Sequence, residues 1–133
     1  MKVYLAGGSS EALMVRGWVD RCRDVGIEVT HDWTSEVLAN QAKGRSDATL
    51  TTEERVKHSL ADLAAVCAAD WVWLLVPAVG SAGCWVELGK ALGRTPVIAS
   101  GPWGRSILTS LCVMRFDDHA SAFAELAARA RAR

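Results

Sequence analysis

Two carboxylates lie where a parallel α/β domain would present them to a ligand. Glu87 falls in the first turns of an expected helix that follows a strongly apolar strand, and Asp62 lies on the helix before that strand. A carboxylate in such a position can face the ligand crevice and take part in its chemistry. On spacing alone, an ordinary solvated position explains both residues more simply. Lys90 follows Glu87 by three residues, the separation of a helical surface ion pair.

A turn rich in glycine and serine joins the first expected strand to the first expected helix. It reads Gly7-Gly8-Ser9-Ser10. Glycines let the backbone approach a ligand closely, and exposed N–H groups at a helix start attract anions. A plain βα connection would use the same residues, and the turn matches neither the Walker A pattern nor G-x-G-x-x-G. The residues leave both interpretations open.

The histidines give a weaker signal. His31 and Asp32 follow the second expected strand, where they either contact a ligand or make ordinary turn interactions. His58 and His119 are expected at the surface. No trio of His, Cys or carboxylate residues has the spacing of metal ligands, so neither a metal nor a cofactor is expected.

Composition and charge limit the function classes. The chain has 133 residues, half of them apolar, and a formal net charge of zero, which fits one domain over residues 1–133. A neutral chain has no global field for a nucleic-acid polymer or an anionic membrane. The longest apolar run, Trp71 to Gly80, is too short to span a bilayer. There is no signal-peptide pattern, and we expect a soluble, cytoplasmic protein.

The cysteines support that location. None lies in a C-x-x-C pair, and each sits in an apolar or helical stretch, so we expect buried thiols in a reducing compartment. They are Cys22, Cys67, Cys84 and Cys112.

Hydrophobic periodicity predicts strands that alternate with helices. The expected strands are 2–6, 27–30, 71–76, 96–99 and 111–116, and the expected helices are 11–25, 51–69, 84–92 and 120–131. Residues 31–50 show no clear period and are expected to form a long loop with at most one helical turn. On the helix 51–69, the expected buried stripe is Val56, Leu60, Leu63 and Cys67.

This alternation predicts the α/β class, as a single flavodoxin- or Rossmann-like three-layer domain with a five-stranded parallel sheet. Ligands of such domains bind beyond the carboxyl ends of the strands. That rule selects four segments, which are 7–10, 31–34, 77–87 and 100–110.

Taken together, these segments resemble the nucleoside 2-deoxyribosyltransferase superfamily, which includes the 2′-deoxynucleoside 5′-phosphate N-hydrolases. The similarity lies in the order and spacing of motifs from residue 2 to about 116. The matching segments are Val3–Gly8, Asp62, Ala69–Leu75, Ser81-x-Gly83-x-x-x-Glu87-Leu88-Gly89, and Gly104-Arg105-Ser106 with Thr109-Ser110.

The resemblance implies a role for each residue that it matches. Glu87 would attack the anomeric carbon of a deoxyribosyl group and displace the base, giving a covalent glycosyl-enzyme. Asp62 would contact the leaving base or assist proton transfer, and Tyr4 would orient Glu87 by a hydrogen bond. The substrate-binding positions would be Gly7, Gly8, Ser9, His31, Asp32, Ser81, Gly83 and Ser110.

Ser81 helps to choose within the superfamily. The position six residues before the glutamate is typically an aspartate in the nucleoside transferases and a serine near the 5′-phosphate in the nucleotide hydrolases. A serine can donate to a phosphate, which an aspartate would repel, so Ser81 favours a 5′-monophosphate. The chain departs from the hydrolases at Ser9-Ser10-Glu11, where they carry an arginine.

The expected activity is therefore hydrolysis of the N-glycosidic bond of (deoxy)nucleoside 5′-monophosphates, with release of the free base. Transfer of deoxyribose between bases and a non-catalytic nucleotide-binding module are the alternatives. The superfamily builds its sites across subunits, and six tryptophans are compatible with an apolar interface, so a homodimer is expected.

Overall fold

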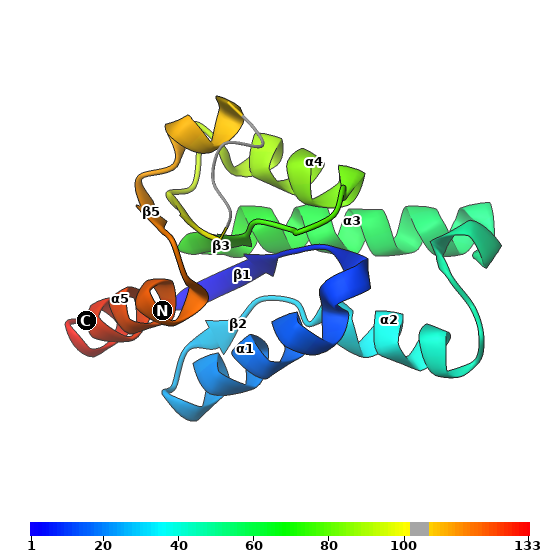
Figure 1. Cartoon of the computed structure of the whole chain (residues 1–133), viewed down its shortest axis with the longest axis horizontal. Helices are drawn as coiled ribbons and strands as arrows, with labels where there is room; N and C mark the ends of the chain where they lie inside the picture. Colours follow the sequence, from blue (N-terminus) through cyan, green and yellow to red (C-terminus); the bar gives the residue numbers. More distant parts are fainter. Residues whose placement is uncertain (102–106) are drawn as a thin grey trace.

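The computed structural model describes residues 1–101 and 107–133 and contains one parallel sheet (Figure 1). The strand order is β2-β1-β3-β4-β5. The strands are β1 (Lys2–Ala6), β2 (Glu28–Val29), β3 (Trp71–Leu75), β4 (Val97–Ser100) and β5 (Met114–Phe116). The predicted fold class is thus confirmed.

Helices cover both faces of this sheet. They are α1 (Ala12–Asp24), α2 (Trp33–Ala42), α3 (Thr52–Ala68), α4 (Ala82–Ala91) and α5 (His119–Arg131). Short 3-10 turns are η1 (Ser9–Glu11), η2 (Asp47–Thr49) and η3 (Ile107–Leu111). In Figure 1, α3 and α4 lie together on one side of the sheet, and α1 and α5 lie on the other. The three layers follow from right-handed crossovers between parallel strands.

The central strands form the core. The side chains of β1 from Val3 onward, and those of β3 from Val72 onward, are buried on both faces of the sheet. Tyr4 and Trp73 are fully buried among them, although each carries a polar atom. Buried polar atoms need hydrogen-bond partners, and these two side chains find theirs at the carboxyl edge of the sheet.

A capping box starts α3. The Thr51 hydroxyl accepts a hydrogen bond from Glu54 N at 3.1 Å, and Glu54 Oε2 accepts one from Thr51 N at 2.8 Å. Such reciprocal bonds satisfy two of the free N–H groups at a helix start. They fix the beginning of the helix that carries Asp62.

The prediction of a loop over residues 31–50 is wrong, because most of this segment forms α2 and η2. The periodicity of α2 is weak, and its stability comes from tertiary contacts. Trp33 is buried, and its indole N–H donates to Leu5 O at 2.8 Å. Val37 and Leu38 pack against the core, and the helix lies along α1.

The predicted buried stripe of α3 is also wrong. Val56 is 52% exposed and Leu60 is 63% exposed, while Ala65 and Val66 are buried instead. Cys67 is exposed, in contrast to the other three cysteines. The sheet and α4 cover the face of α3 that carries the small residues, so the larger apolar side chains point outward.

Within the described part of the chain, no helix is both long enough and apolar enough to cross a membrane.

Candidate active site

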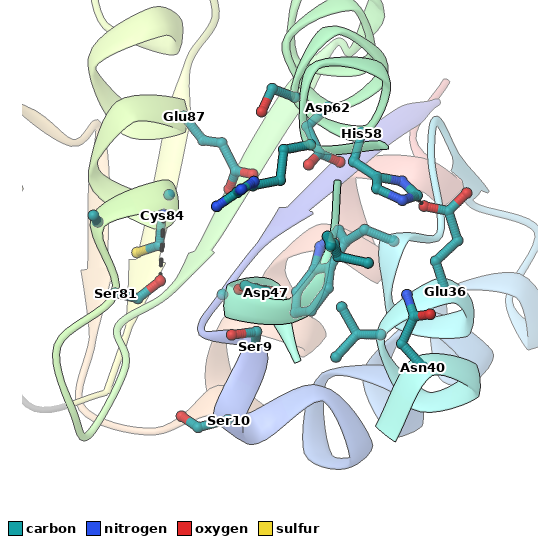
Figure 2. Close-up of a pocket in the computed structure, with 18 of the residues that line it drawn as sticks. Ser9, Ser10, Glu36, Asn40, Asp47, His58, Asp62, Ser81, Cys84 and Glu87 are labelled. Carbon is teal, nitrogen blue, oxygen red and sulfur yellow. Dashed lines mark hydrogen bonds and ion pairs between the residues drawn. The ribbon is translucent and has the colours of Figure 1, made fainter. Parts of the chain in front are cut away.

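A cleft of about 540 Å³ opens at the carboxyl edge of the sheet (Figure 2). The turn after β1, helix α2, the first half of α3 and the start of α4 line it. Its polar lining residues include Ser9, Ser10, Glu36, Asn40, Asp47, Arg55, His58, Ser59, Asp62, Ser81 and Glu87. The rule for ligand sites in parallel sheets selected this edge, and the cleft lies there.

Glu87 is buried within this cleft. It projects from α4, it is only 9% exposed, and its Oε1 accepts a hydrogen bond of 2.8 Å from the Tyr4 hydroxyl. Its Oε2 is buried and has no hydrogen-bond partner in the described structure. The alternative of a solvated surface pair with Lys90 is therefore wrong. A buried carboxylate with one unpaired oxygen is costly to keep, which makes Glu87 a candidate functional residue.

Burial controls the ionisation of Glu87. It raises the pKa of this carboxyl group to about 8, the Tyr4 hydrogen bond opposes the rise, and the charge of Asp62 adds to it. Burial also raises the pKa of Tyr4 far above its ordinary value, with a further rise from Glu87. Tyr4 thus remains a hydrogen-bond donor, and Glu87 holds a proton at neutral pH.

Asp62 lies on α3 beside this pair. Burial raises its pKa, while His31 and the Tyr4 hydroxyl oppose the rise. His31 Nε2 lies 3.6 Å from Asp62 Oδ1, and neither atom has a closer partner in the described residues. Figure 2 shows Asp62 and Glu87 on neighbouring helices, with both side chains directed toward the cleft. The structure therefore brings Tyr4, His31, Asp62 and Glu87 together.

The turn after β1 combines packing with a place in the cleft. A Cβ atom on Gly7 would lie 2.9 Å from Val15 Cγ2, and one on Gly8 would lie 3.2 Å from Pro77 Cβ. Close packing therefore explains both glycines. Gly7 and Ser9 also line the cleft, whereas Gly8 does not.

Ser81 and Gly83 lie at the start of α4 and line the opposite wall. The Ser81 hydroxyl caps the helix by accepting a hydrogen bond from Cys84 N at 3.5 Å. A Cβ atom on Gly83 would meet nothing within 4 Å, so packing does not require this glycine. The first turn of α4 holds no acidic side chain, which leaves its N–H groups open to an anion.

Among the predicted substrate-binding positions, Gly8 and His31 do not line the cleft, and Asp32 and Ser110 lie away from it. Asp32 pairs with Arg23 at 3.0 Å and with Arg16 at 3.4 Å, outside the cleft lining. These arginines and the Thr34 hydroxyl lower the pKa of Asp32, although its partial burial acts in the opposite direction. Ser110 is exposed and is not among the lining residues. The predicted segment 104–106 falls outside the described residues.

Sequence reasoning missed the part of the cleft that α2 and the start of α3 provide. Arg55, His58 and Ser59 precede Asp62 on one face of α3, at the i, i+3, i+4 and i+7 spacing of a helical stripe. This polar stripe was visible in the sequence. From α2, Glu36 pairs with the half-buried His58. Trp33 lies at the base of the same wall, and its place could not be seen while the segment was treated as a loop.

Comparison with solved structures identifies the fold. The 2-deoxyribosyltransferase of the psychrotolerant bacterium Bacillus psychrosaccharolyticus superposes with a TM-score of 0.67 at 21% identity, over 92% of this chain and 90% of that one. The CMP N-glycosidase of Clostridium botulinum superposes with a TM-score of 0.58 at 14% identity, over 95% of this chain and 97% of that one. The protein has the deoxyribosyltransferase fold. No family model matches the sequence, and no curated protein matches it.

The deoxyribosyltransferase fold agrees with the resemblance inferred from motif spacing. Both neighbours are enzymes, and one is named for the transfer of a deoxyribosyl group and the other for N-glycosidic cleavage. At these identities the comparisons establish the architecture. The chemistry of this chain has to be argued from its own cleft.

Proposed function

We propose that this protein is an N-glycoside hydrolase that acts on (deoxy)nucleoside 5′-monophosphates, with Glu87 as the nucleophile. The observation that carries the proposal is the state of the Glu87 carboxylate. Tyr4 holds one of its oxygens, and the other is buried, unpaired and part of the cleft wall. An oriented carboxylate with a free oxygen is what a glycosyl-enzyme mechanism requires.

In the proposed reaction, Glu87 Oε2 forms a bond to the anomeric carbon while the bond to the base nitrogen breaks. The electron pair of that bond leaves with the base, and Asp62 supplies a proton to it. Water, deprotonated by Asp62, then attacks the anomeric carbon of the glycosyl-enzyme and releases the sugar phosphate. The same group acts as acid and then as base, as in retaining glycosidases.

The reaction needs Glu87 ionised and Asp62 protonated. With a pKa of about 8, roughly one tenth of Glu87 is ionised at pH 7. The charge of Asp62 raises the pKa of Glu87, so the ionisation of Glu87 depends on the protonation of Asp62. We propose that the reactive form is the one whose shared proton lies on Asp62.

The substrate argument rests on the two walls of the cleft. Ser9 and Ser10 lie on one side and Ser81 on the other (Figure 2). Ser81 stands at the N-terminus of α4, where a phosphate would meet both a hydroxyl donor and the positive end of the helix dipole. This arrangement supports a 5′-monophosphate over a nucleoside.

The test is release of free base from a panel of ribo- and deoxyribonucleoside 5′-monophosphates and the matching nucleosides, followed by chromatography. Glu87→Gln should abolish release. The exposed α3 residue Glu53 provides the control, because Glu53→Gln makes the same carboxylate-to-amide change outside the cleft. Absence of release from every substrate by the folded wild type would reject the proposal and favour a non-catalytic nucleotide-binding module.

Deoxyribosyl transfer is the second candidate, because the transferase superposes with the higher TM-score of the two neighbours. Transfer and hydrolysis share the glycosyl-enzyme and differ in whether a base or water resolves it. Base release that requires a second free base, with formation of the exchanged nucleoside, would establish transfer.

We also propose a homodimer that forms through the outer face of α3 and α4. The exposed apolar residues Val56 and Leu60 lie on α3, and Val86, which is 59% exposed, lies on the neighbouring α4. This face adjoins the cleft. Leu60→Glu should convert a dimer to a monomer in sedimentation velocity, and a wild-type monomer at all concentrations would reject the dimer. The four free thiols fit the cytoplasmic location that we propose.

A further inference from the structure

The cleft lining holds one cationic side chain that has no partner among the described residues. Glu36 pairs with His58, Asp62 lies beside His31, and Glu87 accepts from Tyr4. Arg55 is the only arginine or lysine in the cleft lining, and within the described part of the chain its guanidinium group makes no hydrogen bond or ion pair. The described structure gives this cation no internal role.

The surrounding contacts keep Arg55 free. Glu54 is its direct neighbour, but both of its carboxylate oxygens accept from Arg45, at 2.9 and 2.8 Å. Elsewhere Arg16 and Arg23 are similarly engaged with Asp32. An arginine fork that lines a cleft and has no carboxylate partner of its own can bind a phosphate from outside.

Arg55 lies toward the N-terminus of α3 from Asp62, at a separation that suits the far end of a bound nucleotide. Helices α3 and α4 lie side by side and run in the same direction (Figure 1). Arg55 comes seven residues before Asp62, and Ser81 comes six residues before Glu87. At a rise of about 1.5 Å per residue, these separations correspond to about 10 Å and about 9 Å. Arg55 and Ser81 therefore both precede the two carboxylates by about two helical turns, and both line the cleft.

The turn after β1 contains no lysine or arginine that could compete with Arg55 for a phosphate. Glu11, which follows this turn, does not line the cleft, and its Oε2 accepts from Ala78 N at 3.1 Å. That contact ties the β1 turn to the loop after β3. A phosphate in the cleft would thus find hydroxyl and N–H donors near Ser81, but a positive charge only from α3.

We propose that Arg55 binds the 5′-phosphate of the substrate and sets the preference for monophosphates over nucleosides. The inference rests on the proposed function, because it assigns the anionic end of the same substrate. Arg55 touches no reacting atom, so it contributes to specificity and not to the bond-breaking step.

The experiment compares Arg55→Ala, Arg55→Lys and the control Arg94→Ala. Arg94 is an exposed arginine beyond α4, outside the cleft lining. Arg55→Ala should lower kcat/KM for a monophosphate by about 10- to 100-fold, the range for one charge-assisted hydrogen-bonded pair, and change kcat/KM for the nucleoside by less than about twofold. Arg55→Lys should recover part of the loss, and Arg94→Ala should behave like the wild type.

A binding measurement separates this inference from the proposed function. Calorimetric titration with ribose 5-phosphate and with ribose should show tighter binding of the phosphate by the wild type, and Arg55→Ala should remove the difference. If Arg55→Ala removes this preference in a protein that releases no base, phosphate binding by Arg55 is supported and the hydrolase activity is rejected. Equal losses on monophosphate and nucleoside, no loss on either, or no preference of the wild type for ribose 5-phosphate over ribose would overturn the role of Arg55.

Discussion

Two polar clusters lie at the carboxyl edge of the sheet, and they are built on opposite principles. In the first, the Tyr4 hydroxyl donates to Glu87, and Asp62 lies beside both residues. In the second, the indole N–H of Trp73 donates to Ser100 Oγ at 2.8 Å, and Ser100 shares a hydrogen bond of 2.7 Å with His119 Nδ1. Both clusters use side chains of central strands.

The difference lies in which atoms remain unpaired. The buried side-chain atoms without a hydrogen-bond partner in the described structure are on Thr30, His31, Asp62 and Glu87. None belongs to the Trp73 cluster. An unpaired buried polar atom typically costs about 1–3 kcal/mol, so a fold retains one where a ligand will complete it. The comparison shows that the cleft cluster retains unpaired polar atoms, so we expect a ligand to complete it, while the polar atoms of the Trp73 cluster are paired within the fold.

The largest effect is expected from a substitution at the centre of the cleft cluster. Glu87→Gln keeps the size of the side chain and its bond to Tyr4 but removes the nucleophile. We expect base release to fall by about 10³-fold or more, as for removal of other enzymic nucleophiles. The measurement is kcat by chromatography of the free base. A residual rate within tenfold of the wild type would show that Glu87 is not the nucleophile.

The next effect concerns the orientation and ionisation of Glu87. Tyr4→Phe removes the hydrogen bond that opposes the rise in the pKa of Glu87. The pKa of Glu87 should therefore rise further, and the alkaline shift of the pH profile of kcat/KM reports it. We expect a loss of about 10- to 100-fold at pH 7, from misorientation and from the smaller ionised fraction. An unshifted profile would mean that Tyr4 has only a packing role.

How far the sequence predicts this molecule differs between the sheet and the cleft. Strands β1, β3 and β4 are continuous apolar runs, so both their positions and their parallel pairing follow from local pattern. The sheet edge then places Glu87, Ser81 and Gly7 on one cleft without further information. These residues also carry the spacing of the superfamily motifs.

The rest depends on contacts between distant segments. Helix α2 has weak periodicity and forms because Trp33 is held by Leu5 O and the helix packs on α1. Without α2, the roles of Glu36 and Asn40 in the cleft lining could not be seen. The outward stripe at Val56 and Leu60 was misassigned for a similar reason, because the packing of α3 on the sheet and on α4 decides which of its apolar residues are buried.

The Trp73 cluster should respond in stability and not in activity. Ser100→Ala leaves the Trp73 indole and His119 Nδ1 without their partner; Ser100 and Trp73 are fully buried, and His119 is half-buried. We expect the free energy of unfolding to fall by about 1–3 kcal/mol, with kcat/KM changed by less than about threefold. Urea denaturation measures the first quantity. Ser59→Ala, an exposed position on the cleft wall, is the control that should leave stability unchanged.

The smallest effect separates the two clusters by the sign of their pH dependence. Glu87 keeps its proton up to about pH 8 in the folded protein, against about 4.5 for an ordinary glutamate. Between these values the folded state binds more protons than the unfolded chain, so this group makes the protein less stable as pH rises. Glu87→Gln removes the penalty, and its Tm should exceed that of the wild type by a few degrees at pH 8 and by less at pH 5.

His119 should act in the opposite direction. Burial lowers its pKa, against opposing effects of Glu11 and Asp118. The unfolded chain therefore takes up the proton first as pH falls below about 6.5, and the stability that His119 contributes is lost toward acid. His119→Gln should flatten the acid side of the Tm profile, where Glu87→Gln flattens the neutral-to-alkaline side. If both variants shifted the profile with the same sign, the two clusters would not differ in the way that their unpaired atoms indicate.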